Sequence, residues 1–151
     1  MASKAEIIEA LVKAYNKELE TIVNYLSCSI DIDGVRAEAI KNALSGDIHG
    51  EITHAQQLGA RVRQLGGTVP GSLSLTMDQT YLQPPRDTTD VVAVIKGVLA
   101  AEEDAIRQYN HIIKLCEGSD YVTQDLATRI LGDEEGHRQQ FEGYLKEYER
   151  G

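Results

Sequence analysis

Two short stretches decide the fold of this 151-residue chain: EITHAQQL at residues 51–58 and EEGHRQQF at residues 134–141. Each begins with a Glu that is followed three residues later by a His, and each continues to a Gln pair and a large apolar residue. Residues three apart lie on one face of a helix, so each stretch presents a carboxylate beside an imidazole. The repetition predicts two halves of similar structure.

A second pattern repeats upstream of each stretch. The matching positions are Glu18, Ile22, Asn24 and Tyr25 in the first half, and Glu102, Ile106, Gln108 and Tyr109 in the second. From Glu18 to Glu51 there are 33 positions, and from Glu102 to Glu134 there are 32. This near-equality predicts a pseudo-twofold arrangement in which both halves face one central point.

Outward from these motifs, apolar periodicity predicts four helices, at about 4–31, 35–65, 90–117 and 120–148. Ser3 and Glu6 have the spacing of a capping box. The third helix is expected to be capped by Asp87, Thr88 or Thr89, and the fourth by Ser119 or Asp120.

The three prolines all fall between Gly66 and Asp90, which predicts a long irregular connection between the second and third helices. A helix of about 28 residues is about 42 Å long, and about 13 extended residues at roughly 3.3 Å each return along it. The prediction is therefore a single all-α domain over residues 1–151, a four-helix bundle with one long crossover. Two independent helical hairpins would leave each apolar stripe unburied.

The inward seam of every expected helix is apolar except near its middle, where a Glu stands. Burying a carboxylate without compensation costs several kcal/mol, and no Lys or Arg lies on these seams. Four carboxylates balance two divalent cations, and a carboxylate and imidazole set without thiolates suits iron or manganese, with zinc as a competitor. The register of the repeat excludes the adjacent Glu103 and Glu135. The predicted ligands are Glu18, Glu51, His54, Glu102, Glu134 and His137.

Bulk composition narrows the function classes. The formal net charge is -9 and no basic run appears, which argues against nucleic-acid binding. No long apolar block or export signal is found, so we expect no membrane association and a cytoplasmic location. Cys28 and Cys116 are expected at opposite ends of the bundle without a disulfide, and His49 and His111 are expected at the surface.

At these motifs the sequence resembles the ferritin-like superfamily, specifically its bacterioferritin and Dps-like branches, from Ala5 to Tyr148. The resemblance implies a di-iron site in which Glu51 and Glu134 occupy the bridging positions. It also implies ferroxidase activity: O₂ or H₂O₂ oxidises Fe(II), and a hollow homo-oligomer stores the ferric mineral. For Tyr25 two roles stay open, a redox-active tyrosine or a core tyrosine that hydrogen-bonds a ligand Glu; for Tyr109 we expect packing beside the ligands. The resemblance rests on Asn16, Glu18, Leu19, Tyr25, Glu51, His54, Ala55, Glu102 and residues 133–137.

Three departures from the family pattern sharpen these expectations. Bacterioferritins ligate haem through a Met at the position of Ile52, so no haem is expected here. Fourteen residues follow His137, too few for the fifth helix of bacterioferritins, which favours the smaller Dps-like cage. We therefore expect a 12-mer, with a 24-mer as the alternative. Thioferritins carry a Cys pair where Asp104 and Gln124 stand.

Two other functions remain as alternatives. One is a di-iron or di-manganese peroxidase or catalase without storage, similar to rubrerythrin. The other is a DNA-protecting mini-ferritin, which the negative charge and the absence of a basic N-terminal tail disfavour. The sequence leaves open the preferred oxidant, the physiological metal and any external electron donor.

Overall fold

The computed structural model describes residues 1–150 and contains four long helices: α1 (Lys4–Asp31), α2 (Glu38–Gln64), α3 (Val91–Leu115) and α4 (Tyr121–Glu149). A single 3₁₀ turn, η1 (Ser72–Ser74), interrupts the connection between α2 and α3, and no strand occurs in the described part. The all-α four-helix bundle predicted from sequence is confirmed. Within residues 1–150 no helix is long and apolar enough to cross a membrane.

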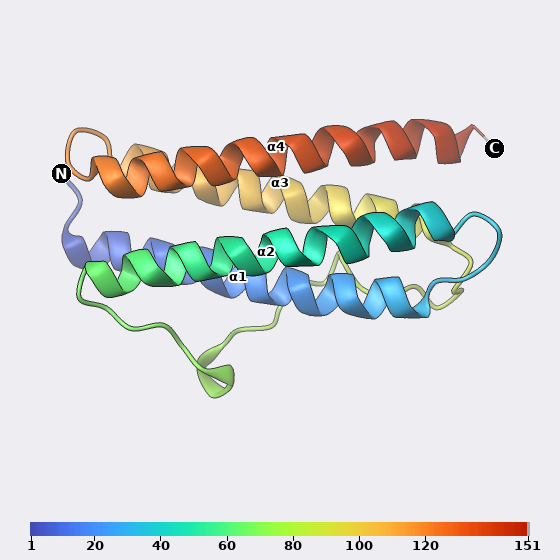
Figure 1. The fold of residues 1–151 in the computed structure, drawn as a ribbon, viewed down its shortest axis with the longest axis horizontal. Helices are drawn as coiled ribbons and strands as arrows, with labels where there is room; N and C mark the ends of the chain where they lie inside the picture. The colour runs from blue at the N-terminus through green and yellow to red at the C-terminus, as the bar shows by residue number, and fades with distance from the viewer. Residues whose placement is uncertain (151) are drawn as a thin grey trace.

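The helices form two closely packed pairs, α1 with α2 and α3 with α4, which meet mainly where α1 contacts α3. Figure 1 shows the second connection returning along the length of α1, so α3 runs antiparallel to α1. Of the three connections between helices, two are short turns and one is a long crossover, as the proline-rich stretch predicts.

Helix ends follow the capping rules, with two corrections. The capping box between Ser3 and Glu6 is present, and Asp120 caps α4. The cap of α3 is Asp90, whose side chain accepts from the Ala93 amide, whereas Asp87 instead accepts from the Thr89 amide in the preceding turn. α2 starts three residues later than predicted because residues 35–37 form a turn, and α3 ends two residues earlier.

The crossover is fastened to α1 by side-chain hydrogen bonds. Asn16 donates to the Thr76 carbonyl and accepts from the Thr76 amide, both at 2.7 Å. The Gln79 amide donates to the buried carboxylate of Glu20. The crossover then passes so close to α3 that a Cβ at Gly97 would lie 2.6 Å from a backbone oxygen. These contacts hold residues 76–82 over the middle of the bundle.

The core consists of two apolar clusters, one toward each end of the bundle. One includes Tyr25, Ile95 and Phe141, and the other includes Leu11, Tyr109 and Ile130. On α1, Glu18 lies between the residues contributed to one cluster and those contributed to the other. The packing therefore leaves a polar layer in the middle of the bundle, between two dry regions.

Candidate metal centre

The polar layer contains one Glu from each helix. The exposed fractions are 3% for Glu18 and 2% for Glu51, Glu102 and Glu134. On α2 and α4 the helical repeat places a His three residues after the Glu: His54 is buried, and His137 is half-buried. All six residues selected from the sequence thus meet at one place, although they span positions 18 to 137.

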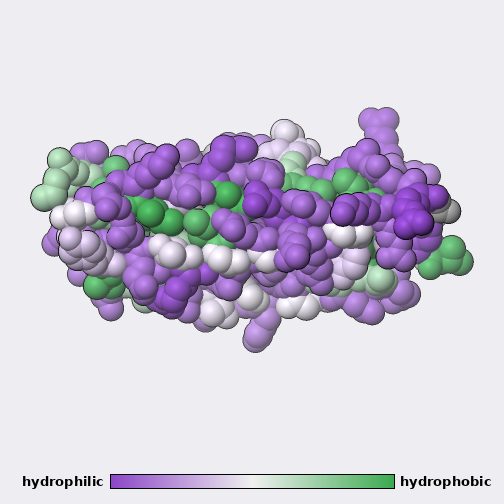
Figure 2. Space-filling model, turned by 90° about the horizontal axis from the view of Figure 1, so that it is seen from above, coloured by the Kyte–Doolittle hydropathy of each residue, from purple (hydrophilic) through white to green (hydrophobic). Residues whose placement is uncertain are grey.

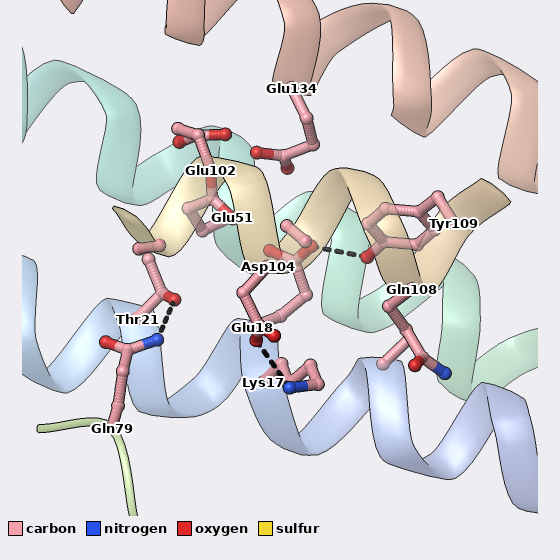
Figure 3. Close-up of a pocket in the computed structure, with 13 residues that line it drawn as sticks. Lys17, Glu18, Thr21, Glu51, Gln79, Glu102, Asp104, Gln108, Tyr109 and Glu134 are labelled. Atoms are coloured by element: carbon pink, nitrogen blue, oxygen red, sulfur yellow. Dashed lines mark hydrogen bonds and ion pairs between the residues drawn. The ribbon is translucent and has the colours of Figure 1, made fainter. Parts of the chain in front are cut away.

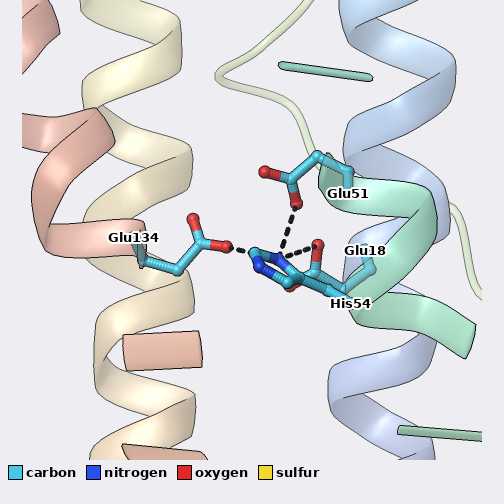
Figure 4. A group of neighbouring side chains, drawn as sticks. All are labelled: Glu18, Glu51, His54 and Glu134. Carbon is cyan, nitrogen blue, oxygen red and sulfur yellow. Dashed lines mark ion pairs between the residues drawn. The ribbon is translucent and has the colours of Figure 1, made fainter. Parts of the chain in front are cut away.

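The six side chains divide into two overlapping groups with metal-ligand geometry. Ligand atoms within each group all lie within 4.8 Å of one another. Figure 4 shows the first group, in which the His54 ring faces three carboxylates that come from three different helices. The first group comprises Glu18, Glu51, His54 and Glu134, and the second comprises Glu51, Glu102, Glu134 and His137.

The two shared carboxylates turn one oxygen toward each histidine. Glu51 places Oε2 at 3.8 Å from His54 Nδ1 and Oε1 at 3.6 Å from His137 Nδ1. Glu134 places Oε1 at 3.2 Å from His54 Nδ1 and Oε2 at 3.7 Å from His137 Nδ1. Each carboxylate can therefore give one oxygen to each of two neighbouring ions, as a bridging ligand does.

Unpartnered polar atoms concentrate in this cluster. Buried polar groups are normally hydrogen-bonded, so such atoms need an explanation. Among residues 1–150, seven buried side-chain nitrogen or oxygen atoms lack a hydrogen-bond partner: one in each of the six residues, and Oδ2 of the adjacent Asp47. Carboxylate oxygens and imidazole nitrogens aimed at a common point fit divalent cations, which would supply the missing partners.

The metal-free cluster holds extra protons. Burial raises the pKa of Glu102 to about 9, and burial together with the charge of Glu18 raises that of Glu51. The nearby carboxylates of Glu102 and Glu134 raise the pKa of His137 to about 11. Ligand groups must lose these protons before they coordinate a cation, so ion binding is coupled to proton release.

Burial shifts the pKa values of His54 and Glu134 in opposite directions, and in both residues the contacts with neighbouring side chains outweigh the effect of burial. Burial alone would lower the pKa of His54, but contacts with Glu134, Glu18 and Glu51 raise it. Burial alone would raise the pKa of Glu134, but contacts with Glu102, His137 and His54 lower it. Glu134 therefore stays ionised when no cation is bound.

Sequence reasoning missed the carboxylates behind the histidines. His54 Nε2 lies 2.9 Å from Asp133 Oδ2, and His137 Nε2 lies 3.9 Å from Asp47 Oδ1. The Asp133 carboxylate is within hydrogen-bond distance of the outer ring nitrogen of His54 and fixes the tautomer that leaves Nδ1 free to bind a cation, whereas Asp47 lies too far from His137 for a hydrogen bond. Asp133 immediately precedes Glu134, but the two aspartates do not occupy equivalent positions of the repeat, so the repeat gave no signal for them.

Two buried tyrosines bond the carboxylates that are not shared. Tyr25 on α1 donates to Glu102 Oε1 on α3 at 3.0 Å, and Tyr109 on α3 donates to Glu18 Oε1 on α1 at 2.5 Å. Each hydroxyl thus reaches the glutamate of the other helix. For Tyr109 the bond goes beyond the packing role expected from sequence.

A small pocket between α1 and α3 leads to the cluster. Figure 3 shows its lining, with the Lys17–Asp104 ion pair and the Gln79–Thr21 hydrogen bond at its outer side. Asp104 therefore forms an ion pair beside the site.

The remaining sequence predictions concern residues away from the cluster. Glu103 and Glu135 are exposed, as are His49 and His111. Cys28 and Cys116 are free thiols in different core clusters, which confirms the prediction of no disulfide. The face shown in Figure 2 is mostly hydrophilic with small apolar areas between, as is usual for a protein surface.

Comparison with known proteins gives concordant matches. A family model described as a ferritin-like domain matches residues 8–151. A DNA protection during starvation protein of Pyrococcus furiosus is 30% identical over 93% of this chain and 77% of its own length. A bacterioferritin of Desulfovibrio desulfuricans is 30% identical over 92% of this chain and 74% of its own length.

Solved structures agree in fold. A dodecameric thioferritin of Bacteroides fragilis superimposes with a TM-score of 0.86 at 24% identity, over 99% of this chain and 89% of that one. A Rhodobacter capsulatus bacterioferritin, whose structure has a metal-free dinuclear site and a haem iron, superimposes with a TM-score of 0.80 at 28% identity, again over 99% and 89%. With a family match over nearly its whole length and a buried cluster of carboxylates and histidines, this chain belongs to the ferritin-like family.

Proposed function

We propose that this protein is a ferroxidase that oxidises Fe(II) at the six-residue cluster and stores the ferric product in a homo-oligomer. The observation that carries the proposal is the division of the Glu51 and Glu134 oxygens between the two histidines. That arrangement supports two adjacent ions per subunit, as di-metal carboxylate bundles use. Family membership supports iron as the metal, although manganese or zinc also suits the ligands.

Each residue of the cluster has a defined task in this proposal. Glu18 and His54 hold one Fe(II), Glu102 and His137 hold the other, and the two shared glutamates hold both. Each bound Fe(II) supplies one electron to the oxidant, O₂ or H₂O₂. The four carboxylates balance the charge of two divalent ions, so the buried layer carries no net charge when both are bound.

Proton movement accompanies loading. The imidazoles of His54 and His137 and the carboxyl groups of Glu51 and Glu102 have raised pKa values and release protons as Fe(II) binds. Asp133 retains the Nε2–H hydrogen bond of His54, which keeps Nδ1 directed into the site.

The proposal includes neither haem nor nucleic acid. Ile52 stands at the haem-ligand position, is 37% exposed and has no ligating atom. The net charge of -9 opposes binding to a phosphate backbone, whatever the role of the relative named for DNA protection. A shift of plasmid DNA by the protein at physiological salt would contradict this part of the proposal.

Aerobic Fe(II) addition tests the proposal directly. We expect a large assembly on size exclusion, a 12-mer with a 24-mer as the alternative, that retains many more than two irons per subunit. Glu51→Gln should abolish rapid oxidation, while Glu135→Gln, an exposed neighbour of a ligand, should not. A monomer or dimer that retains only two irons per chain would contradict storage and favour the peroxidase or catalase alternative.

A further inference from the structure

The tyrosines beside the cluster are related by the same pseudo-twofold symmetry as the ligands. Tyr25 and Tyr109 each lie seven residues after the unshared glutamate of their own helix, and each bonds the unshared glutamate of the other. Tyr25 therefore contacts the group that contains Glu102, and Tyr109 contacts the group that contains Glu18. Each of the two ion positions has a tyrosine of its own.

Both phenols are isolated from water. Their exposed fractions are 0% for Tyr25 and 1% for Tyr109, whereas the other five tyrosines are exposed or half-buried. The chain contains no Trp. A phenol at the end of a hydrogen bond to a carboxylate can lose its electron to the site while its proton passes to that carboxylate, so no charge is left stranded in the core.

We propose that Tyr109 is an electron donor to this site, and that together with Tyr25, acting as the redox-active tyrosine that the family resemblance suggests, it allows O₂ to be reduced fully to water. Reduction of O₂ to two waters takes four electrons. Two Fe(II) supply two of them, and the two phenols supply the other two. This inference rests on the proposed function, since it takes Fe(II) at the cluster as the substrate.

The reaction balances for one chain. One O₂, two Fe(II), two tyrosine phenols and two protons from solvent give two waters, two Fe(III) and two neutral tyrosyl radicals. The O–O bond breaks, two phenolic O–H bonds break and four O–H bonds form in water. Each phenolic proton leaves along its hydrogen bond, from Tyr25 to Glu102 and from Tyr109 to Glu18. A site with only two electrons would stop at H₂O₂.

A single-turnover experiment tests the proposal. Protein loaded anaerobically with two Fe(II) per chain is mixed with O₂ and frozen, and the tyrosyl radical is counted by electron paramagnetic resonance. We expect two radicals per wild-type chain and no released H₂O₂. In Tyr109→Phe the radical count should fall to about half, and in Tyr25→Phe/Tyr109→Phe it should vanish while one H₂O₂ per O₂ appears. Tyr144→Phe, which removes a half-buried phenol bonded to Gln140, is the matched control and should match wild type.

Changing the oxidant provides an internal control. H₂O₂ needs only the two electrons that two Fe(II) supply, so anaerobic H₂O₂ should oxidise the loaded iron without producing radicals. A merely structural role for Tyr109 would affect metal binding, which is measured separately with redox-inert Zn²⁺, but it would leave the difference between oxidants unchanged.

The outcomes separate this inference from the proposed function. If wild type binds two Fe(II) yet consumes no O₂, the proposed function fails. If it consumes O₂ and the radical count and H₂O₂ yield of Tyr109→Phe equal those of wild type, only the role of Tyr109 is refuted. Loss of Zn²⁺ binding in Tyr109→Phe together with an unchanged radical count per bound iron would also refute it.

Discussion

Replacing a shared and an unshared glutamate by glutamine should have different consequences for metal stoichiometry. Glu18 belongs to one ligand group only, whereas Glu51 belongs to both. Glutamine keeps the shape of the side chain and removes its charge. We therefore expect Glu18→Gln to bind one divalent ion per chain tightly and one weakly, and Glu51→Gln to bind both weakly.

The expected magnitude follows from the buried charges. With Glu18 neutral, the first group keeps Glu51, His54 and Glu134, and one positive charge in the buried layer loses its compensation. Leaving a buried charge unpaired costs about 3–5 kcal/mol, which at 1.4 kcal/mol per tenfold weakens binding by between about 100-fold and about 4,000-fold. In Glu51→Gln the same loss of binding free energy is divided between two ions, because Glu51 belongs to both ligand groups.

The assay is a competition titration of Zn²⁺ against a chromophoric chelator, which measures affinity without oxidation. Glu103→Gln and Glu135→Gln are the matched controls, because each removes an exposed carboxylate next to a ligand. The fold should tolerate Glu51→Gln, since burial raises the pKa of Glu51 and so already disfavours its charged form in the metal-free protein. The bridging geometry would be refuted if Glu18→Gln still bound two Zn²⁺ ions tightly. It would also be refuted if Glu51→Gln lost tight binding of only one Zn²⁺ ion.

Two further predictions concern stability. In chelator, the free energy of unfolding should fall as pH rises from 6.5 to 9. Burial raises the pKa of Glu102 from 4.5 to about 9, and neighbouring carboxylates raise that of His137 from 6.5 to about 11. The folded state thus holds extra protons, which it loses with rising pH. Urea titrations measure this slope; saturating Zn²⁺ should reverse it, and a positive slope in chelator would contradict the charge assignment. Gly97→Ala should destabilise the fold by about 1–3 kcal/mol, because its Cβ would lie 2.6 Å from the Tyr81 backbone oxygen. Gly132→Ala, in open space on α4, should instead stabilise it by about 0.5–1 kcal/mol, and equal effects of the two would disprove the close contact.

Much of the fold could be predicted because the local signals agree. The capping box at Ser3, the confinement of prolines to one stretch and the apolar seams all indicate the same four helices. Errors arose at helix ends, where several residues can cap. Asp87 and Asp90 both offer a suitable carboxylate, and the backbone conformation of the turn between them selects Asp90.

The cluster could be predicted from sequence because its members are out of place on apolar seams. The register that separates Glu102 from Glu103, or Glu134 from Glu135, needs only the helical repeat. The same reasoning could not find Asp133 or Asp47. A charged residue beside the apolar face of a helix occupies the same position in the helical repeat whether its side chain faces solvent or a histidine ring.

The sequence by itself therefore determined which residues point inward: four glutamates and two histidines, placed by the period of each helix and by the nearly equal spacing of the two halves. Only the tertiary structure decided which atoms meet. Which oxygens of Glu51 and Glu134 face each histidine, and which glutamate each tyrosine reaches, depend on the rotation and axial shift between helices. Periodicity describes one helix at a time, whereas rotation and shift are set by the packing of apolar side chains from all four.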